Sequence, residues 1–328
     1  MNDAPPARAD VPVFGLVCVT ASDAVRFKTV TRTNYLKLDE AARYEKLDFL
    51  YRENTRRLLG ALEFCNARGI RLYRMTSQLF PMSDLEDGIG ARVLAELAPE
   101  LPEVGRRAAA YGIRVVVHPD QFVVLSSDSE TVYENSVLIL AQHARNLDLM
   151  ELPRSPWSML LLHGGKGGRG EVLARRIATL PPEIRSRLAL ENDEHAYGAQ
   201  AILDVCRAAS VPMVFDAHHH VIKEKLLNYE DESVERFTRA ARDTWPNPDD
   251  QLVHLSNGKE GILDRRHSDL IDTFPTAFLK VKWVEIEAKG KEDAIADLQA
   301  RFADPHAPIL TVRRVPPPEA AYPDKEEV

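Results

Sequence analysis

Short apolar runs alternate with longer helical stretches along most of this chain, and this alternation narrows the folds that the chain can adopt. The runs are rich in Val, Ile and Leu at successive positions, as strands must be when both faces of their sheet are covered. We expect eight buried strands, at residues 13–19, 70–75, 113–118, 158–163, 187–192, 211–216, 251–256 and 277–287.

The stretches between these runs carry apolar residues three and four positions apart, which is typical of amphipathic helices. Eight strands that are each followed by a helical segment predict a single-domain (β/α)8 TIM barrel. A doubly wound open sheet is the alternative fold, but the glycine fingerprint that it would use after the first strand is missing. The clearest helical stretches are residues 44–69, 93–112, 131–150, 198–209, 232–245 and 291–302.

The ends of the chain and its composition also carry information. Residues 1–12 hold no apolar stretch that could serve as a signal peptide, and residues 304–328 are Pro-rich and charged. We expect a flexible N-terminus over 1–12, the barrel over 13–303 and a loose tail over 304–328. The three cysteines lack disulfide or metal-binding spacing, and no apolar run is long enough to span a membrane. These features predict a cytoplasmic protein that folds as a monomer.

A net charge of −8 excludes a surface that attracts nucleic acid over its whole area. Two local segments differ from this average. Residues 24–38 hold four basic residues, including Arg32, with aromatic residues between them and no acid, so they form either a phosphate-tracking loop or an ordinary solvated loop. The glycine-rich HGGKGGRG, residues 163–170, carries Lys166 and Arg169 but lacks the GK[ST] of a P-loop, and forms either a phosphate contact or a flexible turn.

Residue types that bind metals follow the strands at their carboxyl ends. In a closed parallel barrel these ends converge on one rim, where such barrels carry their chemistry. Histidines and acids stand at this end of six consecutive strands, from the third to the eighth, and one more histidine lies in the loop after the seventh strand. They are His118, His163, Glu191, Asp216 with His219, His254, His267, and Glu285 with Glu287.

Each of these residues alone has a simpler explanation, because a strand-end histidine is often a core or capping residue. Together they would lose solvation and repel one another unless cations compensated. Imidazole and carboxylate ligands without thiolates suit Mn²⁺, Zn²⁺, Fe²⁺ or Co²⁺, and so many ligands indicate two or three ions that share carboxylates. Such clusters hydrolyse phosphate esters. Asp216 and His219 would bind together from one turn, whereas we expect His218 and His220 to face solvent.

With these residues the chain resembles the UV damage endonuclease family, whose barrel is similar to those of endonuclease IV and xylose isomerase. The resemblance runs from about residue 13 to residue 293, and HPDQF, LENDE and EAKGKE are its most specific motifs. The matching segments are FGLVCV, ENTRRLLGALEFCNARGIRLYRMTSQLFP, HPDQFVVLSS, LLLHGGKGG, LALENDE, PMVFDAHHH, VHLSNG and VEIEAKGKE.

The resemblance implies a metal-dependent endonuclease that nicks double-stranded DNA immediately 5′ to UV photoproducts, namely cyclobutane dimers and 6-4 photoproducts, and at abasic sites. It implies manganese as the metal, with Zn²⁺, Co²⁺ or Mg²⁺ as alternatives. Gln121 and Phe122 match a dipeptide that probes the duplex, and Lys166, Arg169 and Arg32 would hold phosphates. The implied ligands are His118, His163, Glu191, Asp216, His219, His254, His267 and Glu287, of which Glu191, Asp216, His219 and Glu287 are the expected catalytic residues.

The chain departs from the family pattern at three places. Leu252 stands where the family has a lysine modified to a carbamate, so that ligand is absent. The loop after the second strand, residues 77–87, offers acids instead of a histidine, and either one of them or no residue binds that metal. Leu16 and Thr20 replace a tyrosine and an asparagine that touch the lesion. Metal count and lesion preference therefore stay open.

Three other functions stay open on the sequence alone. A sugar or sugar-phosphate isomerase could use the same metal-binding barrel, but it would need neither the aromatic probe nor the basic loop. The chain could also be a general abasic-site endonuclease, and only the motifs that carry the resemblance speak against this function. A metal-storing or DNA-binding module without activity would not need so many ligands at strand ends.

Overall fold

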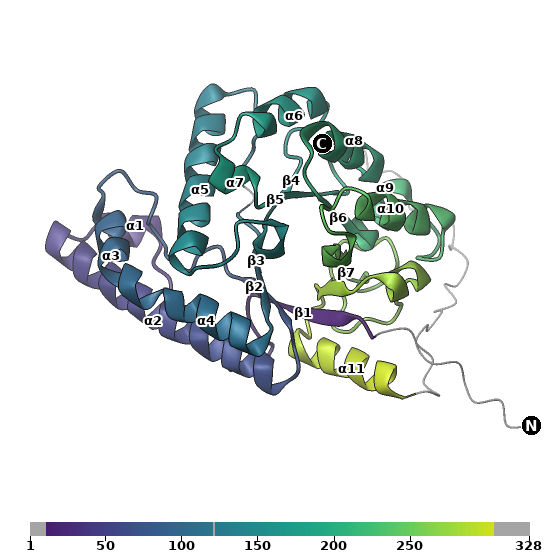
Figure 1. Ribbon diagram of the computed structural model, residues 1–328, viewed down its shortest axis with the longest axis horizontal. Helices are drawn as coiled ribbons and strands as arrows, with labels where there is room; N and C mark the ends of the chain where they lie inside the picture. The colour runs from purple at the N-terminus through teal and green to yellow at the C-terminus, as the bar shows by residue number, and fades with distance from the viewer. Residues whose placement is uncertain (1–10, 121, 305–328) are drawn as a thin grey trace, which may run out of the picture.

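The computed structural model describes residues 11–120 and 122–304, and these residues form a closed barrel of eight parallel strands in chain order (Figure 1). Strand β8 pairs back to β1, with Val13 opposite Trp283, so the ring has no free edge. The predicted TIM barrel is confirmed. The strands are β1 Val13–Val17, β2 Leu72–Met75, β3 Arg114–Val117, β4 Leu160–His163, β5 Leu188–Glu191, β6 Met213–Asp216, β7 Leu252–Leu255 and β8 Trp283–Ile286.

Helices surround this ring, and each long one buries an apolar stripe against the strands (Figure 1). The six predicted helical stretches all contain helices. The helices are α1 Arg32–Leu36, α2 Glu40–Ala67, α3 Ile89–Leu97, α4 Pro102–Tyr111, α5 Glu130–Leu149, α6 Gly170–Ala178, α7 Pro182–Arg185, α8 Ala199–Ala209, α9 Ala217–Glu224, α10 Glu232–Arg242 and α11 Glu292–Ala303, and the 3-10 helices are η1 Ala98–Glu100, η2 Pro156–Ser158, η3 Pro248–Asp250 and η4 Thr276–Lys280.

The connection from β7 to β8 corrects two predictions. We predicted a helical segment after each strand. Residues 256–282 contain no α-helix, and the 3-10 helix η4 is the one helical segment in this connection. The strand expected from residue 277 begins at Trp283 instead. Pro275 is extended and starts η4, and Phe278 then packs against the rings of Phe215 and Phe274, at centroid distances of 6.3 and 6.4 Å. This tertiary contact outweighs the strand propensity of the apolar run.

The amino ends of the strands are closed by a buried arginine. The guanidinium of Arg114 lies over the rings of Trp157, Trp245 and Trp283, at 5.2, 5.4 and 5.5 Å from their centroids. It donates hydrogen bonds to the carbonyls of Trp157, Asp250 and Pro156. Above it, side chains such as Leu72, Val116, Leu161, Val214 and Leu252 fill the barrel with an apolar layer. In the described residues, Arg114 and this apolar layer thus fill the amino end and the middle of the barrel, and the carboxyl ends of the strands remain for a cluster of polar groups.

Two predictions concern residues at the chain ends. Residues 1–10 and 305–328 lie outside the described residues, so the flexible N-terminus and the loose tail stay predictions. Within residues 11–120 and 122–304, no helix combines the length and apolar character that a bilayer span requires.

Candidate metal centre

Strand pairing brings the ligand-type residues side by side at one rim. His163 is the register partner of Glu191, Asp216 of His254, and His254 of Glu285. In a parallel barrel the side chains of paired residues point to the same side of the sheet, so these groups share the barrel interior. The sequence-based placement of ligands at the carboxyl ends of β4 to β8 agrees with this register.

The turn after β6 explains why an aspartate precedes three histidines. Asp216 caps helix α9, and its Oδ1 accepts a hydrogen bond from the backbone N–H of His219 at 2.7 Å. One helical turn thus places the His219 ring beside the carboxylate, as the sequence predicted. The second oxygen, Oδ2 of Asp216, is buried and has no hydrogen-bond partner among the described residues.

Glu191 lies at the centre of the ligand-type residues and is 1 % exposed. Its Oε1 is 2.8 Å from Nδ1 of His254 and 3.7 Å from Nδ1 of His219. Its Oε2 is 3.4 Å from Nε2 of His118 and 3.9 Å from Nε2 of His163. One carboxylate therefore faces four imidazoles that come from four different segments.

Two groups of ligand atoms are close enough to hold a metal ion, and Glu191 belongs to both. Within each group, one atom from each residue lies within 4.8 Å of the others. A carboxylate shared between two such groups is what a pair of bridged ions requires. The first group is His118, His163 and Glu191, and the second is Glu191, Asp216 and His254.

The polar atoms of this centre suit cations. Oε2 of Glu191, Oδ2 of Asp216 and Nδ1 of His163 are buried without a hydrogen-bond partner among the described residues, and such acceptors are costly unless something binds them. Nδ1 of His118 lies 3.0 Å from the carbonyl of Pro119, which fixes the ring and directs Nε2 toward Glu191. The donor set thus fits divalent metal ions.

The pKa values of the residues in this centre also favour the binding of cations. Burial disfavours charge on Glu191, yet His254 and His163 hold the pKa of this carboxyl well below its usual range. Burial would lower the pKa of His219, but Asp216 and Glu191 raise it to about 9. Burial raises the pKa of Asp216. The pKa values of His219 and His254 are raised, so their protonated rings balance the carboxylates, and a divalent ion would displace those protons.

His267 and Glu287, also predicted as ligands, belong to neither group. Oε1 of Glu287 lies 3.5 Å from Nδ1 of His254, so this carboxylate borders the centre. His267 is held by its Nδ1, 2.6 Å from the carbonyl of Glu287, which leaves its Nε2 free to ligate. Their role as ligands stays a prediction.

The expectation that His218 and His220 face solvent is wrong. Both are buried, because α9 begins at Ala217 and turns these two rings away from the side that His219 occupies. Nε2 of His218 is 2.9 Å from the carbonyl of Asp264, and Nε2 of His220 is 2.8 Å from the hydroxyl of Ser233. They anchor α9 to its neighbours.

An ion pair joins Arg74 on β2 to Glu285 on β8; the sequence analysis missed Arg74 and left Glu285 without a role. Arg74 is 8 % exposed, and its Nε and Nη2 donate to the two carboxylate oxygens of Glu285 at 2.9 and 2.7 Å. The signal lay in strand alternation: Arg74 is two residues after the inward Leu72, so it had to face the barrel interior. A charged residue there needs a buried partner.

The departures from the family pattern have structural counterparts. Leu252 lies in the apolar interior layer and offers no ligand. In the loop after β2, Asp87 accepts hydrogen bonds from the Tyr35 hydroxyl and the backbone of Ile89, and no acid of this loop joins either ligand group. Leu16 packs in the hydrophobic core on the outer side of the barrel strands. The hydroxyl of Thr20 forms hydrogen bonds with the backbone of Ser22 and Val25.

Those residues predicted to bind DNA that the structure describes follow strands β1, β3 and β4 and have different surroundings. Phe122 is 73 % exposed, whereas Gln121 lies outside the described residues. Lys166 and Arg169 both form ion pairs with Asp128, and Arg169 also donates to the carbonyl of Ser126 at 2.6 Å. Arg32, the first residue of α1, is exposed.

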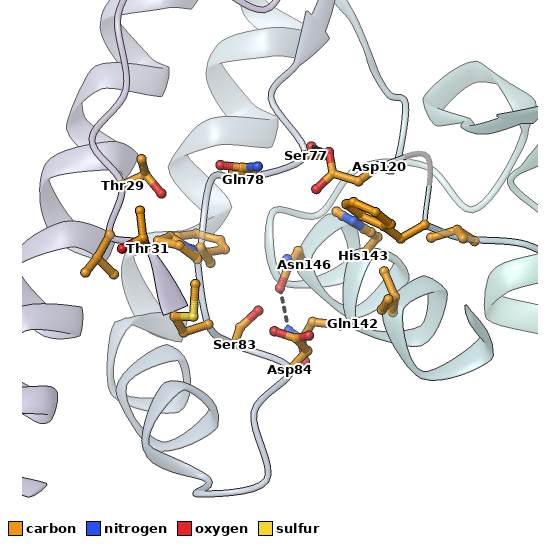
Figure 2. A pocket seen from close by; sticks show the side chains of 17 residues that line it. Thr29, Thr31, Ser77, Gln78, Ser83, Asp84, Asp120, Gln142, His143 and Asn146 are labelled. Atoms are coloured by element: carbon orange, nitrogen blue, oxygen red, sulfur yellow. Dashed lines mark hydrogen bonds between the residues drawn. The ribbon is translucent and has the colours of Figure 1, made fainter. Parts of the chain in front are cut away.

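A pocket of about 410 Å³ adjoins Phe122, between the loops after β1, β2 and β3 and helix α5 (Figure 2). Ten of the seventeen residues that line it are polar, and the other seven are apolar. Ser77 donates to Asp120 at 2.7 Å across one side, and Gln142 donates to Asn146 at 2.9 Å on the helix. The pocket therefore offers hydrogen-bonding groups next to the exposed aromatic ring.

Comparison with known proteins decides the family. The model of the family described as UV-endonuclease UvdE matches residues 12–312. The chain belongs to this family. Its similarity to UvdE relatives is high: it is 53 % identical over 290 residues to a UV DNA damage endonuclease of Deinococcus radiodurans, covering 88 % of this chain and 95 % of the relative. It is 50 % identical over 289 residues to that of a Nostoc species, covering 88 % and 90 %.

Solved structures agree on the fold of this UvdE member. The crystal structure of SacUVDE matches with a TM-score of 0.72 at 23 % identity, covering 88 % of this chain and 98 % of that one. Endonuclease IV from Thermus thermophilus matches with a TM-score of 0.51 at 15 % identity, covering 89 % and 98 %. At these identities the likeness concerns the barrel.

Proposed function

We propose that this UvdE member is a divalent-metal-dependent endonuclease that nicks double-stranded DNA immediately 5′ to UV photoproducts. The observation that carries the proposal is Glu191, a buried carboxylate that joins two groups of metal-ligand atoms at the carboxyl end of the barrel. The relatives that are half identical to this chain are named UV DNA damage endonucleases, which supplies the substrate.

The residues of the centre would divide the work. Glu191, Asp216, His219 and Glu287 would hold and orient the ions, together with His118, His163, His254 and His267. When bound, the ions would supply an activated water and neutralise charge on the phosphodiester as it is cleaved. We propose Mn²⁺ as the metal because the family resemblance implies manganese, and imidazole and carboxylate ligands without thiolates are compatible with it.

Recognition would rest on groups around the rim. Phe122, which is exposed next to a polar pocket, would enter the duplex with Gln121 and replace stacking lost at the lesion. Lys166, Arg169 and Arg32 would contact flanking phosphates. A duplex that carries a cyclobutane dimer, a 6-4 photoproduct or an abasic site needs less energy to unstack and bend than an undamaged duplex. These three lesions are therefore the proposed substrates.

The experiment compares end-labelled duplexes that are irradiated, abasic or undamaged, each incubated with the protein and Mn²⁺. The expected product is a nick directly 5′ to the lesion that disappears when EDTA is added. Equal cleavage of the undamaged duplex, or no cleavage of any duplex with manganese bound, would refute the proposal. Turnover of an aldose by the same preparation would instead support the isomerase alternative.

A further inference from the structure

Two basic residues of the glycine-rich loop after β4 share one carboxylate in the loop after β3. Nζ of Lys166 pairs with Oδ2 of Asp128, and Nη1 of Arg169 lies 2.5 Å from Oδ1 of the same side chain. These two cations are the ones proposed to hold DNA phosphates. Two oxygens of one anion that each meet a different cation make the contacts that a phosphate group would make there. Asp128 therefore occupies the place that a DNA phosphate would take.

The backbone of the glycine-rich loop is held in place by two hydroxyl groups. The buried hydroxyl of Ser126 donates to the carbonyl of Gly164 at 2.7 Å and accepts from the backbone N–H of Lys166 at 2.6 Å. The hydroxyl of Tyr197 donates to the carbonyl of Lys166 at 2.8 Å and accepts from the backbone N–H of Arg169 at 3.2 Å. A Cβ at Gly164 would lie 2.4 Å from the Tyr197 ring. The segment is thus a packed loop, and the two cations keep their places when their counter-ion changes.

The carboxylate of Asp128 has no second structural task in the described residues. Its hydrogen bonds and ion pairs there are those to the two cations. The neighbouring Ser129 caps helix α5, and its Oγ accepts from the backbone N–H of Val132 at 3.4 Å. The Asp128 side chain is half-exposed, and exposed ion pairs contribute little to stability. The carboxylate can therefore leave the two cations at little cost.

We propose that Asp128 competes with DNA phosphate for Lys166 and Arg169 and thereby limits how tightly the protein holds duplex DNA. This inference rests on the proposed function. When a duplex binds, phosphate oxygens would replace the carboxylate oxygens, and the displaced carboxylate would stay nearby as a like charge. Backbone phosphates are the same in damaged and undamaged duplex, so both are affected. The competition keeps the affinity for undamaged duplex low, because no lesion contact compensates there.

The test is the affinity for an irradiated and an undamaged duplex, measured by fluorescence anisotropy in EDTA. We expect Asp128→Asn to lower both Kd values about fivefold, the factor that one unit charge produces about 4 Å from another in water. The slope of log Kd against log salt should steepen by about 0.9, as for one more neutralised phosphate. Asp128→Glu, which keeps the charge, should bind like the wild-type protein. Asp128→Ser also removes the charge and gives the same test should Asp128→Asn fail to fold.

Asp249→Asn is the matched control. Asp249 is an exposed acid that pairs with Arg242 at 2.9 Å, and it lies just before β7, at the amino end of the barrel. Removing its charge should leave both Kd values unchanged. A second control repeats Asp128→Asn in a protein that carries Lys166→Gln and Arg169→Gln. No gain in affinity is expected there, because the cations for which the carboxylate competes are gone.

Three results would overturn the inference: an unchanged or higher Kd without the Asp128 charge, an equal gain in Asp249→Asn, or a gain that persists without the two cations. Lesion-dependent nicking by the wild-type protein in Mn²⁺, beside any of these results, would leave the proposed function standing. A wild-type protein that neither binds nor nicks any duplex would overturn the proposed function together with the inference.

Discussion

Replacing Glu191 with glutamine tests whether one carboxylate joins the two ligand groups. The substitution keeps the size of the side chain but removes its charge and one acceptor oxygen. Because Glu191 belongs to both groups, each ion would lose a ligand. Changes to the outer partners of metal ligands alone lower metal affinity about 10–100-fold. For a direct, shared ligand we expect about 100-fold per ion, which is about 2.8 kcal/mol of binding free energy.

The assay is urea unfolding, followed by circular dichroism, in EDTA and at one fixed Mn²⁺ concentration about 1,000-fold above the wild-type Kd, so that it also exceeds the Kd of the variant. Bound metal raises the free energy of unfolding by RT ln(1 + [L]/Kd), so the manganese-dependent gain should fall by about 2.8 kcal/mol per ion in Glu191→Gln. Comparing gains cancels any change in the stability of the metal-free protein.

Glu292→Gln is the control for this experiment. Glu292 is also buried, and its carboxylate accepts hydrogen bonds from the backbone of Ala21 and Ser22 at 2.6 and 3.0 Å, but it belongs to neither ligand group. Its manganese-dependent gain should equal that of the wild-type protein. A wild-type gain in Glu191→Gln would refute the assignment of this carboxylate as the shared ligand.

Three other perturbations have defined outcomes. His219→Ala should lower nicking of irradiated duplex at least about 100-fold with an unchanged far-UV spectrum, because it removes a ring that lies beside Asp216 and Glu191; full activity would exclude His219 from the centre. In EDTA the free energy of unfolding should fall as the pH rises from 6.5 to about 9, since the folded state holds the His219 proton more tightly than the unfolded state does. Manganese affinity should rise over the same interval, because binding releases that proton, and a Kd that does not change with pH would contradict this. Phe122→Ala should change stability by less than about 0.5 kcal/mol but weaken binding of lesion-bearing duplex by about 1–3 kcal/mol in a fluorescence-anisotropy titration. Leu227→Ala, at an apolar residue that is 83 % exposed, should bind like the wild-type protein; equal affinity of the two variants would exclude Phe122 as the probe.

The barrel could be predicted from the sequence because its strands are buried on both faces and so stand out as apolar runs. Seven of the predicted strands were two residues too long and the last was seven residues too long, since flanking residues of similar character lie outside the strands. The connection after β7 was predicted less well. There η4 forms where Phe278 contacts the rings of Phe215, which is distant in sequence, and of Phe274, which lies before Pro275.

The rim of the barrel could be predicted because parallel strands all present their carboxyl ends to the same side, whatever their exact bounds. The orientation of single side chains could not. His219 lies beside the metal centre, whereas His218 and His220 are turned away from it, and which of the three rings faces the centre depends on the residue at which α9 begins. Arg74 on β2 and Glu285 on β8 meet past the single strand β1 that separates them, and that contact depends on the closure of the barrel.

The most direct measurement is an anomalous difference map, recorded at the manganese absorption edge, from a crystal grown with Mn²⁺. We predict peaks at the carboxyl end of the barrel, including one beside His118 and His163 and one beside Asp216 and His254, with Glu191 between these two. A map without peaks at this end, with the imidazoles turned apart, would contradict a metal-dependent active site in this protein.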